Sequence, residues 1–112
     1  MKRQETYFVD FGKEKLPFRF GILSYMIFKD LFGKEITECK TLTDEVNYYF
    51  SAYKAGCDSD KIVRDTTIDD FIRLVDAYPE NLSILDKFLL DFAKKNLRRQ
   101  KVHKTRTYPF FR

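Results

Sequence analysis

The chain has 112 residues, of which 44% are hydrophobic and 17% aromatic, with a net charge of +4. This length predicts one domain, which buries only about two-thirds of its unfolded surface, so an aromatic-rich chain tends to keep apolar surface for a partner. The amino-terminal segment lacks the apolar core of a secretory signal, and the longest apolar run, residues 22–28, is much shorter than a membrane span of roughly 20 residues. We therefore expect a cytoplasmic protein with no membrane partner.

The sequence contains no pattern that indicates catalysis or metal binding. Glycine-rich phosphate loops, zinc-binding spacings and the nucleophile motifs of hydrolases are absent. Cys39 and Cys57 fit reduced thiols better than a disulfide, and the single histidine, His103, lies in a basic tail without a predicted rigid frame. We expect a protein that is not an enzyme and that uses no cofactor or metal.

The first predicted element is a β-hairpin near the amino terminus. Residues 6–11, "TYFVDF", and residues 16–20, "LPFRF", are rich in aromatic and β-branched side chains and alternate in polarity. Gly12 lies in the polar turn between them and tolerates a positive φ. Because an isolated hairpin is marginally stable in water, we expect this one to pack on the rest of the chain.

The next element is a helix over residues 21–32 that ends at Gly33 and has almost no polar face. One interpretation is a central helix wrapped by the other helices. The alternative is that one face is core and the other binds a second subunit or a hydrophobic client. The two sides group as Leu23, Met26, Ile27 and Asp30 against Ile22, Tyr25, Phe28 and Phe32, and the sequence leaves open which side faces inward. The candidate partner-binding residues are Ile22, Tyr25, Met26, Phe28 and Phe32.

Three amphipathic helices are predicted after this one, over residues 43–55, 67–77 and 79–97. The residues expected to begin or end them are Thr41 or Thr43, Gly56, Thr66 or Thr67, and Pro79. The predicted fold class is therefore mostly α (α+β), with an N-terminal β-hairpin followed by four helices. These elements form a single small helical domain over residues 1–97.

Residues 98–112 are predicted to be a basic, flexible tail. Between residues 94 and 112 there are eight Lys and Arg residues and no acid, whereas the rest of the chain has a net charge of −4. The candidate basic residues are Lys94, Lys95, Arg98, Arg99, Lys101, Lys104 and Arg106. Such a segment fits a solvated extension, an assembly arm that docks on an acidic partner, or a nucleic-acid-binding arm. In the last of these, Lys and Arg neutralise phosphates and nearby aromatic side chains stack on bases.

The order of these elements resembles a known family. A hairpin leads into "FGILSYMIFKDLFGKEI", followed by a helix with "YKAG" at residues 53–56, a Thr-Ile-Asp-Asp start at residues 67–70 and a last helix after "YPENLSIL". Over residues 5–95 this pattern looks like the tail assembly chaperones of long-tailed bacteriophages and prophages. The basic tail is not part of the family pattern.

The resemblance implies a non-enzymatic function in the cytoplasm of a bacterial host. Proteins of this family bind the tape measure protein and keep its hydrophobic helical segments soluble during tail assembly. The expected partner is that protein or another hydrophobic helical client, recognised as an amphipathic helix in an apolar groove. A second copy of the chain is a further candidate partner. The alternative function is a small nucleic-acid-binding or regulatory helical domain that uses the basic C-terminal arm.

Overall fold

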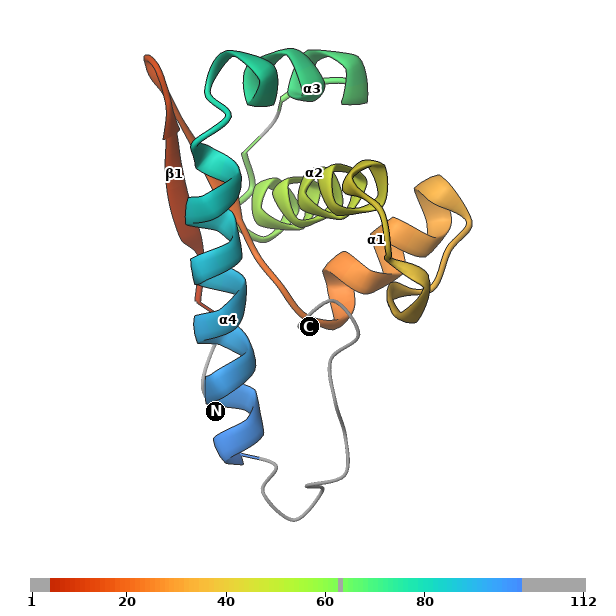
Figure 1. Cartoon of the computed structure of the whole chain (residues 1–112). Helices are drawn as coiled ribbons and strands as arrows, with labels where there is room; N and C mark the ends of the chain where they lie inside the picture. Colours follow the sequence, from red (N-terminus) through yellow and green to blue (C-terminus); the bar gives the residue numbers. More distant parts are fainter. Residues whose placement is uncertain (1–4, 63, 100–112) are drawn as a thin grey trace.

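The computed structural model describes residues 5–62 and 64–99, with side chains described as far as Asn96. The order of its elements is β1 (Tyr7–Phe11), β2 (Glu14–Phe18), α1 (Ile22–Phe32), the 3-10 helix η1 (Ile36–Glu38), α2 (Leu42–Ser59), α3 (Ile68–Ala77) and α4 (Asn81–Arg99) (Figure 1). The predicted class, an N-terminal hairpin followed by four helices, is confirmed.

The hairpin has a tighter turn than the sequence predicted. Its strands pair antiparallel, with Val9 opposite Leu16. Gly12 takes a φ of 73°, which glycine adopts without steric cost, so the turn needs only residues 12 and 13. As a result β2 begins at Glu14 and ends at Phe18, two residues before each end of the predicted strand.

The central helix is α2, and the expectation that α1 is central is wrong. Figure 1 shows α2 between the hairpin and α1, and α2 packs against both. Only two residues of α1 are buried, Ser24 and Phe28. In α2 the bulky tyrosines fill the core and the small residues let neighbouring elements approach: Tyr48, Tyr49, Tyr53, Ser51, Ala52 and Ala55 are all buried. The helix that touches most elements therefore lies in the middle.

Gly56 lies inside α2 and does not end it, which corrects the predicted stop. A Cβ atom at Gly56 would lie 2.5 Å from the carbonyl oxygen of Pro17 in β2, so glycine permits this close contact between helix and strand. The helix continues to Ser59 and ends two residues before Lys61, whose φ is 58°.

The starts of α2 and α3 follow the sequence signals. The hydroxyl oxygen of Thr41 accepts a hydrogen bond from the backbone N–H of Asp44 at 3.1 Å. Thr67 accepts the equivalent bond from Asp70, also at 3.1 Å. Each aspartate in turn accepts from the threonine backbone N–H, which completes a capping box in both helices. The predicted caps at Thr41 and Thr67 are confirmed.

The last helix begins at Asn81, two residues after the predicted start at Pro79. The side-chain amide of Asn81 donates to the carbonyl oxygen of Asp10 at 2.7 Å, which ties the start of α4 to β1. The helix then runs beside β1 and extends to Arg99, past the predicted end at residue 97. No helix within residues 5–62 and 64–99 combines the length and the hydropathy of a membrane span.

Candidate functional site

The first half of α1 exposes apolar side chains while it buries a serine. Ser24 and Phe28, one turn apart, face α2 and are 1% and 0% exposed. Ile22 and Met26 lie on the opposite side of the helix, because two residues correspond to about 200° of rotation, and they are 73% and 63% exposed. Leu23 beside them is 40% exposed. We call Ile22, Leu23 and Met26 the outer face of α1. A surface helix normally turns its polar side to water, and α1 instead presents apolar side chains there.

A hydrogen-bonded cluster fixes this orientation of α1. The Ser24 hydroxyl donates to the carbonyl oxygen of Gly21 at 2.7 Å and lies 2.9 Å from the Tyr48 hydroxyl. Since its one proton is used for Gly21, Ser24 accepts the proton of Tyr48. The Phe28 ring meets Tyr48 edge-on, with 5.9 Å between ring centroids. Burial raises the pKa of Tyr48 well above its ordinary value, so this hydroxyl stays a donor.

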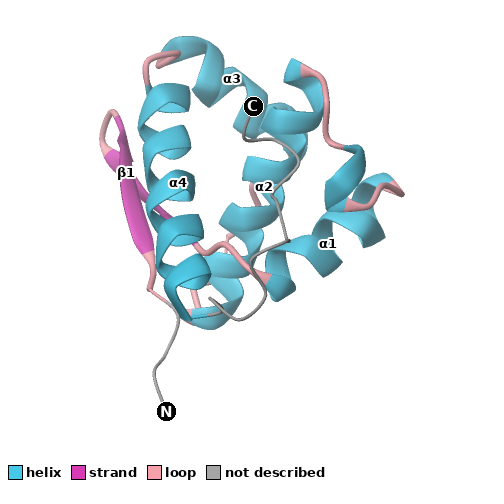
Figure 2. Cartoon of the chain, turned by 60° about the horizontal axis from the view of Figure 1, so that its bottom comes forward, coloured by secondary structure: helices cyan, strands magenta, loops and turns pink. Residues whose placement is uncertain are grey.

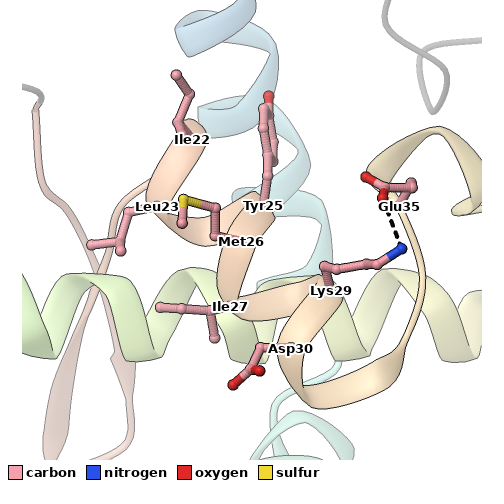
Figure 3. Close-up of a pocket in the computed structure, with 8 residues that line it drawn as sticks. All are labelled: Ile22, Leu23, Tyr25, Met26, Ile27, Lys29, Asp30 and Glu35. Carbon is pink, nitrogen blue, oxygen red and sulfur yellow. Dashed lines mark hydrogen bonds and ion pairs between the residues drawn. The ribbon is translucent and has the colours of Figure 1, made fainter.

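An open groove runs along the outer face of α1 (Figure 3). The figure shows Leu23, Met26 and Ile27 projecting from the same side of the helix. Lys29 reaches from α1 to Glu35 in the following segment, and the 2.8 Å ion pair raises the pKa of Lys29. The residues that line the groove are Ile22, Leu23, Tyr25, Met26, Ile27, Lys29, Asp30 and Glu35. The groove therefore has an apolar wall and a charged rim.

The five predicted partner-binding residues are divided between this groove and the core. Ile22 and Met26 lie on the outer face. Tyr25 and Phe32 are half-buried, and their rings contact Tyr48 and Phe28. Phe28 is 0% exposed, so its prediction as a partner-binding residue is wrong: it fills the contact between α1 and α2.

Five groove residues were not among the predicted site residues. Two of them, Lys29 and Glu35, form the ion pair at the rim, and the other three are Leu23, Ile27 and Asp30. The sequence grouped these three with Met26 on one side of the helix, and that side is the one that faces outward. Ile22 was grouped with the opposite side but lies on the outer face. The signal that could have identified the exposed side is Ser24, whose polar side chain finds its partners in the core.

The predicted basic residues do not form a site within the described part of the chain. Lys94 is exposed, and Lys95 pairs with Glu5 at 2.6 Å and Asp91 at 3.2 Å, which raises the pKa of Lys95. Arg98 and Arg99 belong to α4, but their side chains are not described. Three further predicted residues, Lys101, Lys104 and Arg106, lie outside the described residues.

Among residues 5–62 and 64–96, no cluster of His, Cys, Asp and Glu side chains is arranged to hold a metal ion. Cys39 and Cys57 are both buried, and they are not joined in a disulfide. Comparisons with protein-family models, with curated proteins and with solved structures found no match. The groove on α1 is therefore the feature of the described fold that points most directly to a function.

Proposed function

We propose that this chain is a tail assembly chaperone of a long-tailed phage or prophage. In this proposal it binds hydrophobic helical segments of the tape measure protein in the cytoplasm of the bacterial host and requires no catalysis. The observation that carries the proposal is the outer face of α1, where Ile22, Leu23 and Met26 are exposed while Ser24 is buried. The family-like order of elements in the sequence supplies the identity of the client.

The size of the outer face suits a client that must later be released. Covering the exposed parts of Ile22, Leu23 and Met26 would contribute about 4 kcal/mol, on a scale of roughly 1.5–3 kcal/mol for complete burial of each side chain. Association costs at least about 4 kcal/mol in translational and rotational freedom, so this face alone gives weak binding. Methionine adapts its shape to different apolar partners, which suits a client with several similar helices.

Co-expression tests the proposal. The tape measure protein encoded near this gene should be soluble in complex with the wild-type chain and elute with it on size-exclusion chromatography. Met26→Asp should reduce the soluble complex, whereas Leu42→Asp, at an exposed apolar residue on α2, should leave it unchanged. A tape measure protein that stays insoluble and forms no complex with the wild-type chain would contradict the proposal.

The basic segment supports a second candidate function, nucleic-acid binding. The observation that favours it is the charge of residues 94–112, which include eight Lys and Arg residues and no acidic residue. Neutralising Lys101, Lys104 and Arg106 should then lower the affinity for DNA. The slope of log affinity against log salt concentration should become shallower by the equivalent of about three phosphate contacts. Equal affinity and equal salt dependence in the variant would exclude this function for the segment.

A further inference from the structure

The charged rim of the groove contains a carboxylate, Asp30, that has no cationic partner among the described side chains. Lys29 is occupied by Glu35, and Lys34 lies 2.8 Å from Asp44. Within residues 5–62 and 64–96 no side chain pairs with Asp30, which is exposed beside Met26 and Ile27. An apolar wall next to this carboxylate fits a peptide that carries apolar side chains and, a few residues away, lysine or arginine.

Residues 100–112 of the same chain have this composition. Their sequence, "QKVHKTRTYPFFR", places Tyr108, Phe110 and Phe111 directly after a basic stretch, and it contains no acid. An aromatic cluster preceded by cations matches an apolar groove with a free carboxylate at its rim. With four Lys and Arg residues and no acid, the segment carries a net charge of +4, whereas residues 1–99 are balanced, with 17 basic and 17 acidic residues. The electrostatic attraction that favours docking is therefore the local one to Asp30.

The segment begins close enough to reach the groove. Figures 1 and 2 both show the C-terminal end of α4 and the first turn of α1 at the same end of the molecule. Tyr108 lies nine residues after Arg99, a distance of up to roughly 30 Å in an extended chain. This reach exceeds the shortest dimension of the molecule, which measures 41 × 32 × 26 Å, and the two elements lie at the same end of it.

We propose that residues 100–112 bind back into the α1 groove of their own molecule. In this arrangement the aromatic side chains of Phe110 and Phe111 cover Leu23 and Met26, and the preceding cations lie near Asp30. A second copy is a weaker candidate occupant, because three exposed apolar side chains are few compared with the roughly 20–30 residues that each partner gives to a standard interface. A tethered segment acts at an effective concentration in the millimolar range, so weak contacts suffice to hold it.

The regulatory consequence rests on the proposed function. If the groove also receives the client helix, the bound segment is a built-in competitor that keeps the outer face covered until a client displaces it. Removing a competitor that occupies nine-tenths of the molecules tightens the apparent client affinity about tenfold.

Methyl NMR of the full chain tests the proposal, because its only methionines are Met1 and Met26. An aromatic ring over the Met26 methyl group shifts its ¹³C-labelled signal upfield. We expect F110S/F111S to move the Met26 signal towards the position of a solvent-exposed methionine, at low and at high protein concentration alike. The matched control F8S alters an aromatic residue that is 48% exposed on β1 and should leave Met26 unchanged. An identical Met26 signal in wild type and F110S/F111S would overturn the proposal, and a shift seen only at high concentration would assign the groove to a second copy.

Client binding separates this proposal from the proposed function. A synthetic amphipathic helix from the tape measure protein is titrated into both forms of the chain. Tighter binding to F110S/F111S supports both proposals. Binding that is equal in both forms, with no change at Met26, leaves the chaperone function and rejects the docked segment. A Met26 shift without client binding to either form keeps the docked segment and rejects the chaperone function.

Discussion

The hydroxyls of Ser24 in α1 and Tyr48 in α2 lie 2.9 Å apart in the core, and each residue is 1% exposed. This contact decides which side of α1 faces inward. Because Ser24 is held against α2, Ile22 and Met26 are turned to solvent. The apolar outer face thus follows from a buried polar contact.

The contact predicts a coupled loss of stability. Y48F should lower the free energy of unfolding by about 1 kcal/mol, since it removes one buried hydrogen bond. S24A should lower it by more, since Ser24 also donates to the carbonyl oxygen of Gly21. The double variant should lose less than the sum of the two, with a coupling of at least about 0.5 kcal/mol. Urea denaturation measures all three values. Strict additivity would show that the two hydroxyls contribute independently.

For Gly56 we predict a change in stability on substitution by alanine that is opposite in sign to the change expected from helix propensity alone. In an exposed helix, replacing glycine by alanine stabilises by about 1 kcal/mol. G56A should instead destabilise by about 1–3 kcal/mol, because the new methyl group meets the Pro17 carbonyl oxygen. The control S59A, in the last turn of the same helix, should change stability by less than about 0.5 kcal/mol. A G56A chain as stable as wild type would contradict the close contact between α2 and β2.

The pKa of Asp44 predicts acid sensitivity. The Lys34 ammonium and the backbone N–H groups of Lys40 and Thr41 lower this pKa from 3.8 to about 2. Because the pKa of Asp44 is lower in the folded state than in the unfolded state, its contacts stabilise the fold fully above pH 3.8. This stabilisation is lost as the pH falls towards 2 and the carboxylate becomes protonated. Thermal melts across this range should show a smaller acid-induced decrease of Tm in D44N than in wild type.

K34M is the matched variant for this experiment, because it removes the largest cause of the shift and keeps the carboxylate. Its acid-induced decrease of Tm should lie between those of wild type and D44N. If all three chains lost the same Tm between about pH 5 and pH 2, Asp44 would not contribute to the acid sensitivity.

Local signals in the sequence predicted the order of the elements and two helix starts. Thr41 and Thr67 are each followed three residues later by an aspartate, and the same few residues make the cap. The role of Gly56 could not be read in this way, because its partner Pro17 belongs to the hairpin. A glycine that ends a helix and a glycine that admits a strand look the same in sequence.

The orientation of α1 could not be predicted for a similar reason. Nearly every position of the helix is apolar, so hydrophobic periodicity does not distinguish its two sides. Tyr48, which selects the inner side, is 24 residues away from Ser24. The sequence therefore singled out the helix that carries the groove but counted the buried Phe28 among its exposed residues.

The affinity of a hydrophobic amphipathic helix for the outer face tests the central proposal most directly. A fluorescent peptide from the tape measure protein is titrated with the wild-type chain, with I22D/M26D and with the control L42D, whose altered residue is 64% exposed outside the groove. Circular dichroism should show the same helix content in all three chains. We predict that I22D/M26D binds at least about tenfold more weakly, a loss of about 1.4 kcal/mol or more, and that L42D binds like wild type. Equal affinity of all three chains would contradict the assignment of the outer face of α1 as the client-binding site.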